Sequence, residues 1–269
     1  MLAIKKPTLR GLFYCASFKN FKGFMLRVLC VIPSRLGSTR LPKKPLAKIG
    51  NRPMIQWTYE RAKQCAELTH LVIATDSEEI AHVAQQFGAP VVMTDKNIKT
   101  GSDRVAYVAE QYPDIDVVIN LQGDEPFIHQ DMLRLLIKPY LEGHTPDMTT
   151  LAFPILSPQE MQDPGVVKVL LNQYGQALYF SRAPIPYYRQ EGQAPVYHHM
   201  GLYAFRRDFL LHYTTLKPTP LEHIESLEQL RALEHGHNIH VNITSMRTLE
   251  VNTQEELDRA QAFAHSIVP

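Results

Sequence analysis

Two short polar segments of this 269-residue chain carry residue types that can bind and transfer phosphate groups. The segment 33–45 gathers cations around Gly37, and main-chain N–H groups beside arginine and lysine side chains form a good cradle for a triphosphate. The segment 122–126 reads Gln-Gly-Asp-Glu-Pro, and an acidic residue there could hold Mg²⁺ against phosphate oxygens. Taken singly, the first could be a solvated basic turn and the second an Asx turn or a helix cap, but together they favour a nucleotide–metal site. The cations of the first segment are Arg35, Arg40, Lys43 and Lys44.

Each of these segments directly follows an apolar run that reads as a buried strand, at 28–32 and at 116–121. Between them, strands and helices alternate, which predicts an α/β fold of Rossmann-like type: a mostly parallel sheet with helices on both faces. Ligands of such sheets bind outside the carboxyl ends of the strands, so both polar segments belong at one edge. The further strands expected in this half are 71–74 and 90–93, and the helices are 53–66, 76–87 and 102–111.

The second half predicts more strands and two further helices, which we interpret as an antiparallel lobe, around 150–215, inserted into the same sheet. We expect this lobe also to supply a dimer surface. The closing helix is capped by Asn252 or Thr253, with Glu255 and Glu256 in its first turn. The expected strands are 149–154, 166–171, 178–180, 199–205 and 239–243, and the expected helices are 221–234 and 253–265.

Composition excludes several classes of protein. The formal net charge of +1 provides no basic field for nucleic acid, and no apolar run reaches the length that membrane insertion needs. Three cysteines without metal-ligand spacing indicate reduced thiols and a cytoplasmic location. Residues 1–24 contain five basic residues and no acidic one, so we predict an N-terminal extension that is disordered or a start-site artefact, with Met25 as the true start. Residues 25–269 then form a single domain with the lobe around 150–215.

Several motifs resemble those of the 3-deoxy-manno-octulosonate (Kdo) cytidylyltransferases, and the resemblance covers about 28–260. The opening motif 34–46, Ser-Arg-Leu-Gly-Ser-Thr-Arg-Leu-Pro-Lys-Lys-Pro-Leu, is shared with other sugar nucleotidyltransferases. The segments Tyr179-Phe180-Ser181-Arg182 and Leu227-Glu228-Gln229-Leu230-Arg231 are much more specific to the Kdo enzymes. Other matching segments are 74–76, 101–104, 121–126, 199–203 and 221–226.

The resemblance implies an enzyme that transfers CMP from CTP to Kdo, releasing pyrophosphate, with Mg²⁺ as cofactor, and so activates the sugar for lipopolysaccharide synthesis. It implies a homodimer as well. Catalysis is assigned to Arg35, Lys44 and Asp124, and the metal to Asp124 and Asn252. CTP binding is assigned to Arg35, Ser38, Arg40, Lys44, Gly101, Ser102 and Arg104, those of 101–104 largely through backbone groups that read the cytosine. Kdo binding is assigned to Gln122, Arg182, His199, Glu228 and Gln229.

Two positions depart from the family pattern. Lys43 stands where the family usually has glycine, and Asn252 stands where it has an aspartate that serves as a second metal ligand. Asparagine is a neutral and weaker oxygen ligand for Mg²⁺, which puts the number of bound metals in question. His198 and His199 are adjacent on an expected strand, so at most one of them should face the substrate.

Three alternatives to Kdo activation stay open at the level of sequence. The chain could be a cytidylyltransferase for an amino-substituted Kdo or for sialic acid, although the Tyr179–Arg182 segment argues against sialic acid. It could also be a non-catalytic nucleotide-binding relative, which Asn252 favours and which Arg35, Lys44 and Asp124 oppose. We interpret Glu222, His223 and Glu225 as an ordinary solvated helix face, not as a metal site.

Overall fold

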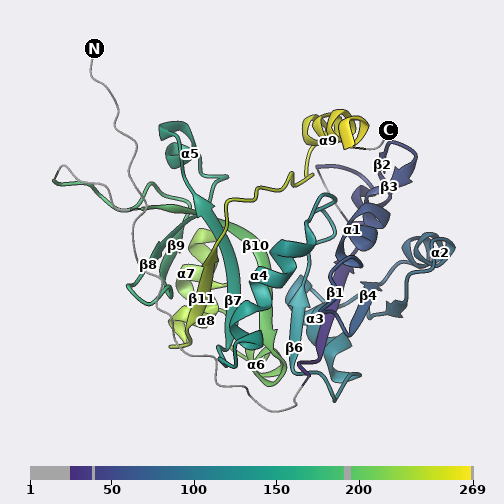
Figure 1. The fold of residues 1–269 in the computed structure, drawn as a ribbon, viewed down its shortest axis with the longest axis horizontal. Coiled ribbons are helices and arrows are strands. Elements are labelled where there is room, and N and C mark those ends of the chain that lie inside the picture. The colour runs from purple at the N-terminus through teal and green to yellow at the C-terminus, as the bar shows by residue number, and fades with distance from the viewer. Residues whose placement is uncertain (1–24, 38–39, 191–194, 268–269) are drawn as a thin grey trace.

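The computed structural model describes residues 25–37, 40–190 and 195–267, and it places nine strands in one large sheet (Figure 1). The strands are β1 (Val28–Ser34), β4 (His70–Thr75), β5 (Val91–Met93), β6 (Val117–Asn120), β7 (Met148–Pro154), β8 (Lys168–Leu171), β9 (Ala177–Ser181), β10 (Tyr197–Arg206) and β11 (Ile239–Ile243), with β2 (Lys48–Ile49) and β3 (Arg52–Pro53) forming a separate pair. The helices are η1 (Lys44–Leu46), α1 (Met54–Ala62), α2 (Glu78–Gln86), α3 (Gly101–Glu110), α4 (Gln130–Leu141), α5 (Pro158–Gln162), α6 (Arg207–Tyr213), α7 (Pro220–Glu225), α8 (Leu230–Glu234) and α9 (Gln254–Ile267).

The large sheet is mainly parallel, as predicted. Its strand order is β11-β7-β10-β6-β1-β4-β5, and β10 alone on this path runs antiparallel to both of its neighbours. The antiparallel strands β8 and β9 join the far end of β10 and extend the sheet into the lobe. One long strand therefore connects the parallel sheet to the lobe.

The alternating side chains of β1 pack into two hydrophobic clusters. Val28, Cys30 and Ile32 pack with α1, α2 and α4, whereas Leu29 and Val31 pack with α3 and α6. Helices thus cover both faces of the sheet, which confirms the predicted fold class.

A third apolar cluster attaches the closing helix α9 to residues 41–57 and to Phe127. Figure 1 shows α9 beside β2, β3 and α1. Its contacts include the ring of Phe263, whose centroid lies 4.7 Å from that of Phe127, which in turn lies 5.6 Å from Trp57. This packing brings residues near 250 back to the segment that follows β1.

The prediction of one long helix over 221–234 is wrong. Helix α7 starts with a capping box between Thr219 and Glu222, and it ends at Ser226, whose φ of 52° is left-handed. Helix α8 starts again at Leu230. Because of this break, Glu228 and Gln229 do not lie on the surface of a regular helix. The structure also contains α4, α5, α6 and the β2–β3 pair, which we did not predict.

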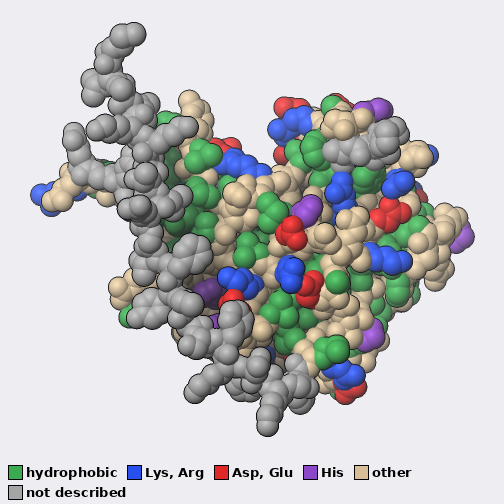
Figure 2. All heavy atoms as spheres, in the orientation of Figure 1, with side chains coloured by type: hydrophobic (Ala, Val, Ile, Leu, Met, Phe, Trp, Pro, Cys, Tyr) green, Lys and Arg blue, Asp and Glu red, His purple; other side chains and the backbone are tan. Residues whose placement is uncertain are grey.

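On the face shown in Figure 2, basic and acidic side chains are interspersed among the described residues, in keeping with the net charge. In the described part of the chain, the helices are too short or too polar to span a bilayer.

Candidate active site

The polar segments that follow β1 and β6 meet at one edge of the sheet, because these strands are parallel neighbours. A close approach at Gly123 fixes their relative position. A Cβ atom added there would lie 2.9 Å from Ser34 Oγ and 3.4 Å from Pro33 O, so any larger residue would push the segments apart. The Gly123 carbonyl also accepts a hydrogen bond from Thr58 Oγ1 at 3.2 Å. Asp124, the next residue, is thereby held at the carboxyl edge.

Lys44 is the centre of the charged cluster. Its Nζ donates to Asp124 Oδ2 at 2.6 Å and to Asn252 Oδ1 at 2.7 Å. The backbone helps to bring these residues together, since Val251 N donates to Asp124 O at 3.0 Å. The structure thus assembles, from three distant segments, the residues predicted for the α-phosphate and the metal.

Two further carboxyl groups crowd this cluster. Glu125 is 7% exposed, and its burial, with the nearby charges of Glu250 and Asp124, raises its pKa to about 8 although Thr248 donates a hydrogen bond to it. Partial burial of its carboxyl group and the charge of Asp124 likewise raise the pKa of Glu250. We call Asp124, Glu125, Glu250 and Asn252, grouped around Lys44, the carboxylate corner. Oxygen donors that converge on a cation and repel one another fit a Mg²⁺ ion that is held by one or two protein oxygens and by phosphates.

Asn252 is not the cap of α9. Thr253 Oγ1 accepts from Glu256 N at 3.2 Å, and Glu256 Oε2 accepts from Thr253 N at 3.0 Å, so Thr253 and Glu256 form the capping box. Glu256 Oε2 also accepts from Asn252 N at 2.7 Å. The side chain of Asn252 is therefore left to bind Lys44 and Glu250.

The other cations of the segment after β1 are exposed. Arg35 Nη1 donates to Lys99 O at 3.3 Å, which directs it toward the segment that leads into α3, and Arg40 lies on the surface. Ser38 lies outside the described residues. Two exposed guanidinium groups beside the carboxylate corner can reach a polyphosphate.

The start of α3 lies against the same edge. Thr100 caps it by accepting from Asp103 N at 3.0 Å, and a Cβ on Gly101 would be 3.8 Å from Pro33 Cγ and 3.9 Å from Gln122 Nε2. Gln122 Nε2 itself donates to Asn120 Oδ1 at 3.2 Å. The first turn of α3 therefore faces the segments after β1 and β6.

Arg104 points elsewhere. Its guanidinium, 2% exposed, donates to Asp76 Oδ2 at 2.8 Å and to Thr94 Oγ1, so it connects α3 to the strand ends of β4 and β5. Arg104 can support the nucleotide side through its backbone and through this anchoring.

On the lobe, the turn between α7 and α8 presents two polar groups. Glu228 accepts a hydrogen bond from the Ser102 side chain, while its Oε1 and the Nε2 of Gln229 are buried with no hydrogen-bond partner among the described residues. Burial raises the pKa of Glu228, against the effects of Ser102 and Arg231. Buried polar groups almost always have partners, so these atoms point to a polar ligand.

His199 lies beneath this turn on β10. Its Nε2 is 3.1 Å from Thr150 Oγ1, and its ring centroid is 4.8 Å from that of Phe180. Burial lowers its pKa to about 3, so His199 is neutral at physiological pH. His198 instead packs on Phe153, in the opposite cluster, which confirms that the two histidines face opposite sides of the strand.

Arg182 makes its hydrogen bonds mainly to backbone carbonyls. Its guanidinium donates to Glu225 O at 2.9 Å and Pro164 O at 3.0 Å. Behind it, the fully buried Lys168 Nζ donates to Asp163 O, Val166 O and Arg182 O at 2.6–2.9 Å. Burial lowers the pKa of Lys168, whose three partners are neutral oxygens, so the partly exposed guanidinium of Arg182 is the cation that an anionic ligand can reach.

Comparison with known proteins places this geometry in a family. Residues 29–239 match the cytidylyltransferase family. A 3-deoxy-manno-octulosonate cytidylyltransferase from Acaryochloris marina is 52% identical over 238 residues, which are 88% of this chain and 97% of that protein. One from Synechococcus elongatus is 47% identical over 241 residues, 89% of this chain and 99% of that protein. The chain belongs to the 3-deoxy-manno-octulosonate cytidylyltransferase family.

A solved structure agrees with this assignment. The structure of a CMP:2-keto-3-deoxy-manno-octonic acid synthetase complexed with CTP is 39% identical to this chain and superposes with a TM-score of 0.85. The match covers 90% of this chain and 100% of that one. The family resemblance seen in the motifs is thus confirmed by both sequence and fold.

The structure shows how a lysine is accommodated at position 43, where the family usually has glycine. Its φ of 50° lies in the left-handed region that favours glycine, so a lysine there carries backbone strain. Its Nζ forms an ion pair with Glu79 at 2.7 Å, which offsets part of that strain. The extra cation is directed to α2, away from Lys44.

Sequence reasoning missed four residues that contact or lie near the predicted positions: Lys168, Glu225, Glu125 and Glu250. Lys168 carried a signal, since it is a lysine inside an otherwise apolar expected strand. Glu225 accepts from Ser181 Oγ at 2.6 Å and Arg182 N at 2.9 Å, and Glu222 pairs with Arg231. These two glutamates, which we interpreted as a solvated face, instead fix the lobe.

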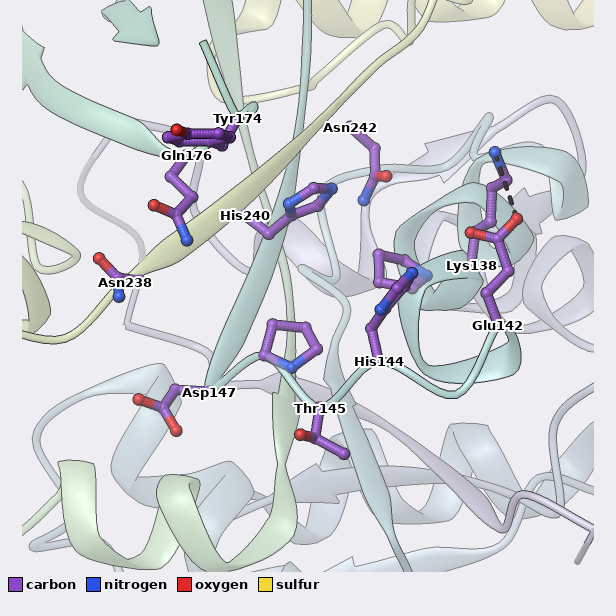
Figure 3. A pocket seen from close by; sticks show the side chains of 12 residues that line it. Lys138, Glu142, His144, Thr145, Asp147, Tyr174, Gln176, Asn238, His240 and Asn242 are labelled. Atoms are coloured by element: carbon purple, nitrogen blue, oxygen red, sulfur yellow. Dashed lines mark ion pairs between the residues drawn. The ribbon is translucent and has the colours of Figure 1, made fainter. Parts of the chain in front are cut away.

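A separate cavity of about 560 Å³ lies at the other end of β7 and β11 (Figure 3). His144, Asp147, His240 and Asn242 are among the side chains around it. The described residues that line it include none of the positions predicted for CTP, Kdo or metal. The cavity is therefore separate from the predicted site.

Proposed function

We propose that this protein transfers CMP from CTP to Kdo, giving CMP-Kdo and pyrophosphate, and that the carboxylate corner and the lobe hold the two substrates. The anomeric oxygen of Kdo forms a bond to the α-phosphorus while the bond from that phosphorus to the bridging oxygen breaks, and the hydroxyl proton is released. CMP-Kdo is the activated sugar that lipopolysaccharide synthesis consumes. The observation that carries the proposal is the meeting of Lys44, Asp124 and Asn252 at 2.6–2.7 Å.

The cationic residues have distinct tasks in this reaction. Arg35 and Arg40 are exposed and reach the β- and γ-phosphates, where a planar guanidinium can bind two oxygens at once. Lys44 lies deeper and stabilises the charge that develops on the α-phosphate. Ser38 belongs to the same segment and adds a hydroxyl donor.

We infer that Mg²⁺ is the cofactor and that Asp124 and Asn252 hold it. When bound, it neutralises phosphate oxygens and the departing pyrophosphate. In the absence of metal, Lys44 Nζ binds Asp124 Oδ2 and Asn252 Oδ1, so the negative charge of Asp124 is already balanced before the nucleotide arrives. Lys44 can then turn toward the triphosphate.

The nucleotide base lies at the start of α3, where first-turn N–H groups are available and Gly101 leaves room for it. The sugar lies between Gln122 and the lobe. There, Arg182 faces the C1 carboxylate with the charge of Lys168 behind it, and the unpartnered atoms of Glu228 and Gln229 bind hydroxyl groups. Neutral His199 supports this surface from below.

A single assay tests the proposal. Purified protein is incubated with CTP, Kdo and Mg²⁺, pyrophosphate release is followed, and the nucleotide sugar is identified by mass spectrometry. We expect CMP-Kdo, and no product would overturn the proposed function. Parallel reactions with amino-substituted Kdo and with sialic acid decide between the acid sugars, and we expect Kdo to have the highest kcat/KM.

We further propose a homodimer in the cytoplasm. Leu178 on β9 and Ile224 on α7 are 60% and 75% exposed, and their neighbours Tyr179 and Glu225 are hydrogen-bonded at 3.3 Å, so these apolar side chains belong to one area of the lobe. Cys30 and Cys65 are both free and buried, which suits a reducing compartment. Analytical ultracentrifugation should give the mass of two chains, and Ile224→Glu should shift it toward one.

A further inference from the structure

The Asn252 side chain can present either an acceptor or a donor to a neighbouring group, because its amide has an oxygen at one end and an NH₂ group at the other. Only the oxygen can bind a cation, and an amide rotated by half a turn would present N–H groups to it instead. The orientation of this amide therefore decides whether position 252 serves a cation at all.

Two partners of opposite kind determine that orientation. Lys44 Nζ has only donors, and it lies 2.7 Å from Asn252 Oδ1. The Glu250 carboxylate has only acceptors when ionised, and Asn252 Nδ2 donates to its Oε1. Lys44 alone would not suffice, because it must be free to turn toward phosphate during the reaction, whereas Glu250 binds the other end of the amide.

The backbone of Asn252 is fixed as well. Asn252 N donates to Glu256 Oε2 at 2.7 Å, and Val251 N donates to Asp124 O at 3.0 Å. With the main chain held on both sides, the remaining freedom of residue 252 is the rotation of its side chain, and Glu250 is the group that limits it.

Charge gives Glu250 a second effect. An asparagine contributes no negative charge to a divalent cation, whereas an ionised Glu250 carboxylate, which accepts from Asn252 Nδ2, lies one hydrogen bond behind that ligand. A carboxylate behind a neutral ligand polarises it and raises its basicity, as carboxylates do behind metal-bound histidines.

We propose that Glu250 is a positioning residue of the cation site: it holds the amide oxygen of Asn252 toward the cation and supplies the negative charge that asparagine lacks. This inference rests on the proposed Mg²⁺ site. It means that Glu250 compensates for the asparagine at position 252, where the family has an aspartate. It predicts that orientation and charge can be separated by substitution.

The test measures CTP binding by isothermal titration calorimetry, with and without Mg²⁺, in the absence of any sugar so that no turnover occurs. Glu250→Gln keeps an acceptor for Asn252 Nδ2 but removes the charge, and Glu250→Ala removes both. We expect the gain in CTP affinity caused by Mg²⁺ to fall about tenfold in Glu250→Gln and further in Glu250→Ala, in line with other residues that orient metal ligands. Metal-free CTP affinity should stay within about twofold of wild type.

Two further variants make the test specific. Glu255→Gln removes the same charge from an exposed position in the first turn of α9 and should behave as wild type. Asn252→Asp combined with Glu250→Gln returns a carboxylate to the corner and should restore the Mg²⁺ effect to within about threefold of wild type.

An unchanged Mg²⁺ effect in both Glu250 variants, or a wild-type protein whose CTP affinity ignores Mg²⁺, would overturn the inference. An equal loss in Glu255→Gln would also overturn it, because general charge would then explain the result. Failure of the proposed function has a different signature: Mg²⁺-dependent CTP binding that responds to Glu250, with no CMP-Kdo formed.

Discussion

The carboxylate corner and the lobe hold their charges in different ways. In the corner, the cation Lys44 binds side-chain oxygens, one of them charged, and carboxyl groups repel one another. On the lobe, Lys168 and Arg182 bind backbone carbonyls. Glu228 and Gln229 each carry a buried polar atom without a partner among the described residues, as Glu125 does in the corner. The corner is therefore arranged to exchange ions, whereas the lobe is arranged to keep its cations fixed. Substitutions in the corner should affect turnover first, and substitution of the buried lobe cation Lys168 should affect stability first.

Asp124→Asn should have the largest effect of all on turnover. We expect kcat to fall at least about 100-fold, because the group that balances Lys44 and would hold the metal loses its charge. The fold should persist, since Asp124 supports no apolar core, and far-UV circular dichroism should match wild type. Asp114→Asn, whose side chain is 77% exposed, is the matched control and should keep full activity. Near-wild-type turnover of Asp124→Asn would remove it from the site.

Lys168→Met should show that the lobe cations support the structure. Three carbonyl oxygens would lose their donor, so we expect a loss of about 2–4 kcal/mol in the free energy of unfolding, measured with urea. Lys138→Met, at a side chain that is 56% exposed, should change it by less than about 0.5 kcal/mol. Equal stability of the two variants would break the distinction between corner and lobe.

Glu125 gives the corner a pH-dependent stability. Because its folded pKa of about 8 lies above its ordinary value of 4.5, folding takes up a proton between these limits, and this contribution to stability is lost as pH rises through 8. Glu125→Gln should remove that dependence. In the presence of EDTA, we expect the variant to gain about 1–3 kcal/mol over wild type between pH 5 and pH 8. Parallel stability curves for the two proteins over this range would contradict the buried-acid assignment.

Gln229→Met should affect sugar binding without a cost in stability. The unpartnered Nε2 is removed from a buried position, so the melting temperature should be equal to or higher than that of wild type. The KM for Kdo should rise about tenfold, because a donor to the sugar is lost, while the KM for CTP stays constant. A rise in both KM values, or a lower melting temperature, would assign Gln229 to the framework of the lobe.

The smallest effect should come from removing residues 1–24. A chain that begins at Met25, which is 88% exposed, should keep its kcat and its melting temperature within about 1 °C, because the first strand starts three residues later. A clear fall in melting temperature would show that the extension stabilises the domain.

The sequence was most informative where structure is local. The apolar run at β1 lies where its pattern predicts, and helices α2 and α3 begin and end within two residues of the expected ranges 76–87 and 102–111. Lys44 and Asp124 could be placed together because parallel strands end at one edge. Family resemblance then added Asn252, whose contact with Lys44 spans 208 positions.

What sequence could not supply arises from contacts between distant segments. The break at Ser226 has no glycine or proline to mark it, and Leu227 behind it is buried by packing against other elements. Glu225 reads as a helix surface residue until β9 brings Ser181 and Arg182 to it. Glu250 and Glu125 acquire their roles only from the return of the chain before α9 to the end of β6.

The antiparallel strand β10 also has a consequence for synthesis on the ribosome. The edge of β6 that β10 covers, from Val117 to Asn120, is made about 90 residues before Arg206, its partner, so at ordinary rates of translation it stays uncovered for roughly 5–20 s. An open edge of four buried apolar or amide residues is a template for pairing with another nascent chain. In pulse proteolysis, ribosome-bound chains stalled near residue 150 should be cleaved in the β1–β6 region. Chains stalled far enough downstream for residue 206 to have left the ribosomal tunnel should be protected in that region. The strand that joins the parallel sheet to the lobe thus also closes the growing protein against aggregation, and it is among the last parts of the sheet to become available.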